Sequence, residues 1–242
     1  CLRSSGLRLD QFVSKALGVS RREARAEIRR GRVKVDGQVQ RQAGLFIDKE
    51  CGVRCAGQRL ELPGPLYLMM NKPVGLVSAT TDRNQPTVLT LLPDALAARV
   101  HLAGRLDRDT SGLLLLSDDG DWTHRITSPR HRCPKTYVVQ LAEPLAADAE
   151  QRLAAGMQLR RDPKPARPAH LQRLGDRRVR VTVFEGRYHL VRRLFAALGN
   201  HVETLHRERI GGLGLDGDLA AGQWRALSEI EQNMVLDVSD LG

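Results

Sequence analysis

The sequence predicts an α+β protein with a small basic domain followed by a larger, nearly neutral one. Helix and strand patterns mix along the 242 residues without regular βαβ alternation, which favours a mostly antiparallel sheet with flanking helices. Residues 1–59 contain 14 Lys and Arg against 6 Asp and Glu, a net charge of +8, so the rest of the chain carries only +2 of the total +10. Pro63, Gly64 and Pro65 signal a linker. We therefore divide the chain into residues 1–62 and residues 63–242.

The N-terminal region has the pattern of two helices and a hairpin. Apolar residues recur at helical spacing over residues 9–17. Ser20 and Glu23 match a capping box at the start of a second helix, and Gly31 is its stop signal. Asp36-Gly37 then predicts the tight turn of a β-hairpin.

The second helix carries clustered arginines with few acids between them. A solvated helix face usually interleaves acids, so we expect these side chains to bind phosphate. The RNA-binding candidates are Arg21, Arg22, Arg25 and Arg29, with Lys34 in the hairpin. The run LDQFVSKALGVSRREARAEIRRGRVKVDG, within residues 7–54, resembles the S4 RNA-binding domain. That resemblance implies an RNA partner but names no reaction.

The larger domain shows further strand and helix patterns. The expected strands are Tyr67–Met70, Leu113–Leu116, Thr136–Leu141, Val179–Phe184 and His201–Leu205. Helices are expected over His189–Gly199 and near the C-terminus, where Ser228 and Glu231 match a second capping box. Asp118-Asp119-Gly120 is expected to form a turn.

Several familiar chemistries are absent from the sequence. There is no P-loop, no G-x-G-x-x-G fingerprint and no G-x-S-x-G elbow. The four cysteines form no C-x-x-C pair, and the seven histidines show no ligand spacing. We therefore expect no cofactor, no metal and reduced thiols in a cytoplasmic protein. The sequence also has no long apolar run and no apolar signal segment, which predicts no membrane association.

The stretch GRLDRDTSGLLLL at residues 104–116 contains the acids of most interest. Four consecutive leucines predict a buried strand, so the preceding loop lies at a strand end. Ordinary turn chemistry with loop amides accounts for Asp109. The residues alone leave Asp107 equally open to a structural and a reactive role.

The larger domain resembles the pseudouridine synthases. GRLDRDTSGLLL is similar to the signature loop of that superfamily, whose first Asp is catalytic; this position is Asp107. KTYVV, at residues 135–139, resembles the motif with the active-site Tyr, which is Tyr137. The resemblance implies an isomerisation without cofactor, in which a uridine base is detached, turned over and rejoined through C5.

Three further stretches carry the same resemblance. EGRYHLVRRLF resembles the motif whose basic residue, Arg192, pairs with the catalytic Asp and would hold Asp107 ionised. KPVG at residues 72–75 and HRERIGGLGL at residues 206–215 match two other motifs. Leu190 is a departure, because a Gln is usual there.

The resemblance covers about residues 7–232, and an S4 domain followed by this catalytic domain is the arrangement of the RsuA-type branch. Within that branch, residues 117–137 and 199–212 resemble the enzymes that act on small-subunit (16S) ribosomal RNA. The resemblance implies that Asp107 attacks C1′ or removes a C2′ proton, a choice the sequence leaves open. It also implies that Tyr137 stacks on the uracil and that Lys72 contacts substrate. Arg105 either fills the space left by the flipped nucleotide or contacts phosphate.

The expected partner is ribosomal RNA, within a pre-ribosomal small-subunit particle, bound by a monomeric enzyme. Two alternatives remain. One is a large-subunit (23S) synthase of the same branch, and the other is a non-catalytic S4-type assembly factor.

Overall fold

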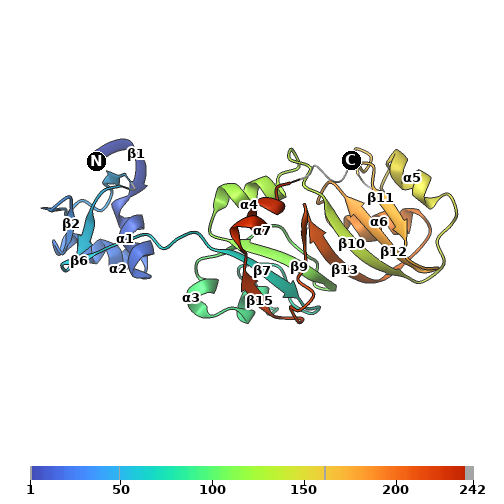
Figure 1. Ribbon diagram of the computed structural model, residues 1–242, viewed down its shortest axis with the longest axis horizontal. Coiled ribbons are helices and arrows are strands. Elements are labelled where there is room, and N and C mark those ends of the chain that lie inside the picture. Colours follow the sequence, from blue (N-terminus) through green and yellow to red (C-terminus); the bar gives the residue numbers. More distant parts are fainter. Residues whose placement is uncertain (1, 49, 161, 238–242) are drawn as a thin grey trace. The chain divides into compact units, whose positions relative to one another are not determined.

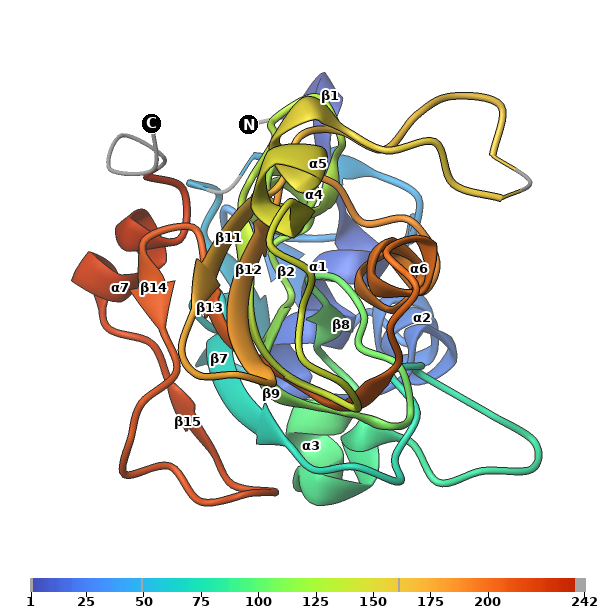
Figure 2. The ribbon, with the colours of Figure 1, turned by 90° about the vertical axis from the view of Figure 1, so that its right-hand side faces the viewer.

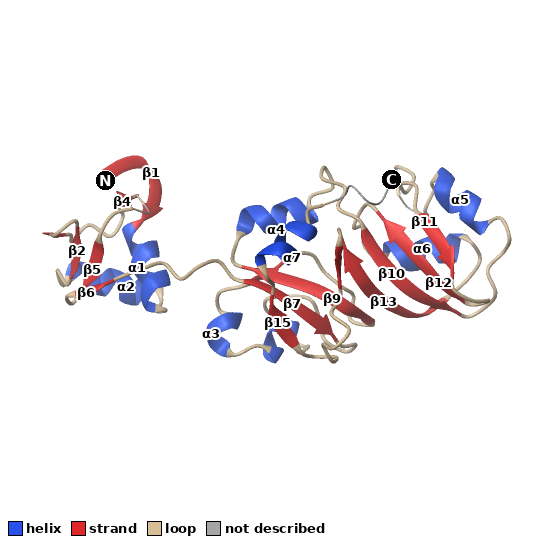
Figure 3. Ribbon diagram, viewed as in Figure 1, coloured by secondary structure: helices blue, strands red, loops and turns tan. Residues whose placement is uncertain are grey.

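The computed structural model describes residues 2–48, 50–160 and 162–237, with side chains described from residue 6 (Figures 1 and 3). The chain divides into two compact units, Cys1–Gly64 and Pro65–Gly242, and each is described by itself. Cys1, one of the four expected thiols, lies outside the described residues. Within the described part, no helix combines the length and apolar character that crossing a membrane requires.

The N-terminal unit combines two helices with short strands. Its elements are β1 (Leu2–Arg8), α1 (Leu9–Leu17), α2 (Arg21–Arg29), β2 (Val33–Val35), β3 (Gln38–Val39), β4 (Phe46–Ile47), β5 (Val53–Cys55) and β6 (Gln58–Arg59). One sheet has the order β3-β2-β5-β6, and β1 pairs with β4. Phe12, Val13 and Ile28 from the two helices pack against Val33 and Val53 of this sheet.

Local signals in the sequence predict the ends of these elements well. Gly18 ends α1 in the left-handed conformation, with φ 66°. Ser20 and Glu23 form the expected capping box at the start of α2. Asp36 and Gly37 both have positive φ in the turn between β2 and β3, as a tight hairpin turn requires.

The C-terminal unit contains one long sheet with helices on both sides. Its elements are β7 (Tyr67–Lys72), η1 (Val88–Leu91), α3 (Asp94–Ala97), β8 (His101–Leu102), β9 (Thr110–Ser117), α4 (Gly120–Thr127), β10 (Lys135–Leu141), α5 (Ala149–Ala155), β11 (His170–Arg173), β12 (Arg178–Val183), α6 (Leu190–Ala197), β13 (Val202–Ile210), β14 (Leu213–Gly214), β15 (Trp224–Ala226) and α7 (Glu229–Met234). Figure 2 shows α6 packed along one side of β12 and β13.

The sheet order is β11-β12-β10-β13-β9-β7-β15, with β8 added along β9 and β14 along β13. Its strand pairs are antiparallel except for β13 and β9, which run parallel where Arg207 lies opposite Gly112. Gly112 has a φ of 106°, and a Cβ there would lie 2.3 Å from the Arg207 carbonyl oxygen. Glycine is therefore what allows β9 and β13 to meet. The α+β prediction with a mostly antiparallel mixed sheet is confirmed.

The four leucines of β9 are buried from both faces of the sheet. Leu113 and Leu115 pack with Trp122 and Ile126 of α4. Leu114 and Leu116 pack on the opposite side, against η1 and the segment that follows it. This double burial explains why β9 reads as a continuous apolar run and not as an alternating one.

The expected turn at residues 118–120 is instead the start of a helix. The Asp119 carboxylate accepts hydrogen bonds from the amides of Asp121 and Trp122, so it caps α4. The capping box of Ser228 and Glu231 begins α7 as expected.

Candidate active site

The acidic loop, residues 103–109 between β8 and β9, is fixed at its centre by the buried side chain of Leu106. Leu106 is buried, and its backbone both donates to and accepts from the Ser78 hydroxyl, at 3.1 and 2.8 Å. The Asp107 carbonyl accepts from the Thr110 amide at 3.1 Å, which closes the turn into β9. The loop is thus held by its backbone, and its acidic side chains are left to other partners.

Lys72 holds the far end of the same loop. Its side chain is fully buried, and Nζ donates to the carbonyls of Pro73, Arg108 and Thr110 at 2.9, 3.4 and 2.8 Å. Burial lowers the pKa of Lys72 to about 8, although the nearby carboxylates of Asp109 and Asp107 oppose this. The expectation that Lys72 contacts substrate is wrong here, because no part of its side chain reaches the surface. Its role in the KPVG motif is to bind the loop.

Asp107 lies in the wall of a cavity of about 360 Å³, a size that suits a small-molecule or nucleotide group. Arg105, Tyr137 and His189 line the same cavity. Nε2 of His189 is 3.5 Å from Oδ1 of Asp107, and the Asp107 side chain is 30% exposed. The structure therefore brings together three of the residues predicted for the site, and Asp107 remains accessible from the cavity.

Arg192 does not pair with Asp107, contrary to the prediction. Its Nη2 lies 2.7 Å from Oδ2 of Asp109, and its Nη1 donates to the Val202 carbonyl at 2.9 Å. The reason is geometric: Val202 begins β13, and β13 runs beside the strand that Asp109 precedes. In this arrangement His189, one position before α6, is the side chain that reaches Asp107.

Tyr137 is half-buried on β10 and packs against the core that α6 covers. Arg207 lies beside it, with the guanidinium carbon 6.0 Å from the centre of the Tyr137 ring. Both side chains line the cavity. The residue expected to stack on the uracil therefore lies in the wall of the same cavity as Asp107.

His189 and Tyr188 are site residues that the sequence interpretation missed. Their rings stack with centroids 3.8 Å apart and planes 17° apart, and Tyr188 is 75% exposed. His189 adopts positive φ, at 50°, which turns the chain into α6 and places both rings at the cavity. Two adjacent aromatic rings inside a matched motif, EGRYHLVRRLF, were the signal that could have found them.

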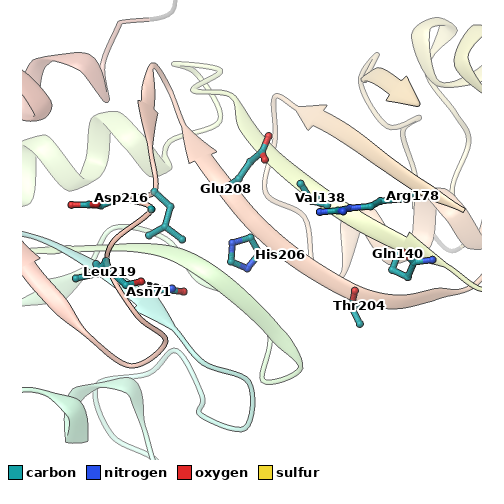
Figure 4. A pocket seen from close by; sticks show the side chains of 11 residues that line it. Asn71, Val138, Gln140, Arg178, Thr204, His206, Glu208, Asp216 and Leu219 are labelled. Atoms are coloured by element: carbon teal, nitrogen blue, oxygen red, sulfur yellow. Dashed lines mark hydrogen bonds between the residues drawn. The ribbon is translucent and has the colours of Figure 1, made fainter. Parts of the chain in front are cut away.

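A second and larger hollow, of about 600 Å³, does not contain the predicted residues. Figure 4 shows Thr204, His206 and Glu208 of β13 beside Val138 and Gln140 of β10. Alternation along β13 explains the separation: residues 204, 206 and 208 line this hollow, whereas Leu205 and Arg207 line the cavity of Asp107. On the side of β9, His206 Nδ1 of this hollow lies 2.9 Å from Oγ of Ser111, the second residue of that strand.

The predicted RNA-binding side chains of the N-terminal unit are exposed, and two of them share one buried acid. Arg25 Nε and Arg21 Nη2 lie 2.8 and 3.2 Å from Oδ2 of Asp10, while Arg8 Nε lies 3.2 Å from Oδ1. Burial alone would raise the pKa of Asp10, but these hydrogen bonds outweigh it and lower the pKa to about 2. Arg22, Arg29 and Lys34 are exposed nearby in sequence. Asp10 was not identified from the sequence.

Comparison with known proteins defines the class. The family model for RNA pseudouridylate synthases matches residues 66–197, more than half of the chain, and the S4 domain model matches residues 7–50. The chain belongs to the RNA pseudouridylate synthase family and is an isomerase with an N-terminal S4 domain.

Two relatives and one solved structure show how similar the chain is to individual proteins. The ribosomal small subunit pseudouridine synthase A of Escherichia coli (strain K12) is 51% identical over 226 residues, which cover 93% of this chain and 98% of that protein. The protein of the same name from Vibrio vulnificus (strain CMCP6) is 45% identical over 231 residues, covering 95% and 99%. A solved structure described as a crystal structure of pseudouridylate synthase has 42% identity and a TM-score of 0.70, covering 95% of this chain and all of that one.

Proposed function

We propose that this chain isomerises one uridine of small-subunit (16S) ribosomal RNA to pseudouridine. The observation that carries the proposal is the 51% identity across nearly the full length of a relative whose name states that activity. The accessible carboxylate of Asp107, in a cavity with Tyr137, supports it. We further propose that residues 1–62 bind the RNA and residues 63–242 carry the reaction.

Asp107 is the proposed reactive carboxylate. Cleavage of a sugar–base bond leaves electron deficiency at C1′, which a carboxylate can meet by bonding to C1′ or by taking the C2′ proton. The base leaves with the bonding electron pair on N1, turns, and forms a new bond from C5 to C1′. This bond displaces the Asp107 carboxylate from C1′, or is accompanied by return of the proton to C2′. The C5 proton is then lost and N1 gains a proton, so atoms and charges balance without a cofactor or metal.

The remaining site residues take supporting roles in this proposal. Tyr137 stacks on the uracil and assists removal of the C5 proton. Arg192 is a positioning residue, because its ion pair with Asp109 holds the end of the acidic loop that carries Asp107. The exposed side chain of Arg105, at the cavity mouth, either fills the space of the flipped nucleotide or contacts phosphate.

The test compares two neighbouring acids of one loop. We expect Asp107→Asn to abolish tritium release from RNA that contains 5-tritiated uridine while RNA binding is retained. Asp109→Asn is the matched control and should keep measurable turnover, because Asp109 is 64% exposed, pairs with Arg192 and does not line the cavity of Asp107. Undiminished turnover by the Asp107 variant would refute the assignment of Asp107.

The choice of subunit requires a separate experiment. Carbodiimide mapping of pseudouridine in both ribosomal RNAs, after incubation with unmodified particles, should show one new site in the small-subunit RNA. A new site in 23S RNA would favour the large-subunit alternative, and a normal pattern in cells lacking the protein would favour an assembly factor. We also propose that the chain acts as a monomer in the cytoplasm, on immature small-subunit particles. Co-sedimentation of the chain with these particles tests the proposed association.

A further inference from the structure

Two buried cations and one half-buried cation lie around the acidic loop and the cavity of Asp107, and each is held by backbone carbonyl oxygens. They are Lys72, Lys135 and Arg207. Among the described residues, none of the three forms an ion pair with a carboxylate. A cation bound only to neutral carbonyls leaves a local net charge of +1. A cation paired with a carboxylate forms a pair whose net charge is zero. The positive charge of these three side chains is therefore not cancelled by a direct ion pair.

Arg207 is the clearest of the three. Its side chain is 3% exposed, Nε donates to the Leu113 carbonyl at 2.8 Å, and Nη1 donates to the Arg105 carbonyl at 3.3 Å. Its Nη2 is buried without a hydrogen-bond partner. A guanidinium is permanently charged, and burying one without a carboxylate is unfavourable. Arg207 nevertheless lines the cavity of Asp107.

Lys135 repeats this arrangement on the neighbouring strand. Its Nζ donates to the carbonyls of Ile126 and Cys133, at 2.8 and 2.7 Å. Lys135 begins β10, two residues before Tyr137, and its side chain lines the same cavity. Two cations therefore flank the place where Tyr137 would hold a base.

The other charges at this cavity are matched or exposed. Glu185 lies against Arg187, with 3.0 Å between Oε2 and Nε. Arg105 is exposed, and Asp107 faces His189. Among the described residues that line the cavity, four Lys and Arg side chains stand against two carboxylates, a net charge of 4 − 2 = +2. The members of that excess without an ion pair and without full exposure are buried Arg207 and half-buried Lys135.

We propose that Arg207 and Lys135 stabilise the negative charge that develops on the uracil base when its bond to C1′ breaks. The inference rests on the proposed function and assigns two residues to the charge on the base, whereas Asp107 acts on the sugar. The electron pair of the C1′–N1 bond stays on the base in both routes open to Asp107, so the base carries one negative charge in either. Rejoining through C5 returns that pair to a covalent bond to C1′.

The way these cations are held suits this task. Their hydrogen bonds to backbone carbonyls fix them before substrate arrives, so little reorganisation is needed as charge develops. Arg207 is buried and Lys135 is half-buried, so solvent screens their charge less than it would on the surface. A detached uracil anion must also remain in the cavity to be rejoined, and two fixed positive charges favour its retention over release.

The test uses the leaving ability of the base. Fluorine at C5 withdraws electrons and stabilises the uracil anion by itself, so a fluorinated base needs less help from the protein. We would measure single-turnover rates of base rearrangement by the full chain on small-subunit transcripts made with uridine or with 5-fluorouridine. Mass spectrometry of the digested RNA is the readout, because C5 of 5-fluorouridine carries no proton whose loss could be followed. Lys135→Met should slow reaction of uridine by about 10–100-fold, which is below the loss of a directly bound oxyanion donor. Its deficit on 5-fluorouridine should fall to a few-fold.

Charge-conserving variants separate electrostatics from packing. Lys135→Arg and Arg207→Lys should recover most of the rate on uridine, whereas Arg207→Met should behave like Lys135→Met if circular dichroism shows it folded. Equal deficits on the two substrates, in folded Lys135→Met, would overturn the proposal and leave only a structural role. Wild-type pseudouridine formation in the same reactions reports on the proposed function separately.

Discussion

Replacing Asp10 with Asn should loosen the N-terminal unit without unfolding the rest of the chain. The Asp10 carboxylate is fully buried and joins Arg8, Arg21 and Arg25, which come from the start of α1 and from α2. Asn keeps the shape but carries no charge, and its amide group presents hydrogens where the arginines also donate. The contact between α1 and α2 at this point is therefore lost.

The magnitude follows from the pKa of Asp10. A change from 3.8 to about 2 corresponds to about 2.4 kcal/mol of stability at neutral pH. The three arginine side chains are 40–51% exposed, and solvent screening reduces this value to about 1–2 kcal/mol. Because the folded pKa is depressed, this stability is complete above pH 3.8 and is lost as the pH falls through about 2.

Hydrogen exchange by mass spectrometry is the appropriate assay. Both tryptophans, Trp122 and Trp224, lie in the C-terminal unit, so fluorescence does not report on the N-terminal one. Amides of α1 and α2 should exchange about 5–30-fold faster in the variant at pH 7, and the difference should shrink as the pH falls below 4. Glu61→Gln, which removes a pair between side chains 71% and 79% exposed, is the control and should change little. Equal protection at pH 7, or a difference that persists at low pH, would refute the electrostatic explanation.

Four other predictions follow from the structure. Gly112→Ala should lower the melting temperature sharply, because its Cβ would lie 2.3 Å from the Arg207 carbonyl oxygen; an unchanged melting curve would contradict the close approach of β9 and β13. Tyr188→Ala should weaken RNA binding by about 1–3 kcal/mol in a filter-binding assay if the exposed ring stacks on a base. Burial disfavours the charged form of Lys72 in the folded state and lowers its pKa to about 8, whereas the unfolded chain keeps 10.5. Between these pH values the unfolding free energy of wild type should therefore rise relative to that of Lys72→Met, by up to about 3 kcal/mol, as measured by urea titration. Replacing four arginines of α2 together by Ala should reduce the slope of log binding constant against log salt concentration by about 2–3. An unchanged slope would favour a purely solvated face. The residues are Arg21, Arg22, Arg25 and Arg29.

Local signals were sufficient for much of the fold. Capping boxes, glycine stops and the Asp36-Gly37 turn depend on neighbouring residues, and the structure confirms each of them. Asp119 shows the limit of such signals, because an Asp before Gly suits both a turn and a helix N-cap. Whether a helix follows depends on Trp122 and Ile126 finding a buried place against β9.

The site depended more on tertiary placement. Motifs identified Asp107 and Tyr137 as neighbours, but the partner of Arg192 is decided by where β13 begins, which local pattern does not contain. Lys72 resembled a surface contact in sequence, since burial of a lysine cannot be read from KPVG alone. The position of Arg207 could have been predicted from the sequence. It lies two residues after Leu205, so extending the expected strand to residue 207 would have placed both side chains on one face of the sheet.

The central position of β13 also determines when this enzyme can first work. Asp107 and Tyr137 are synthesised long before residues 202–210, yet β13 lies between β10 and β9 and supplies Arg207. In a nascent chain that lacks β13, strands β11-β12-β10 and strands β9-β7 are not joined, and the cavity lined by residues of β10, β9 and β13 is incomplete. The N-terminal unit is synthesised first and forms a compact unit by itself, so it can fold as soon as it emerges. Each molecule therefore acquires the means to hold RNA well before the means to alter it.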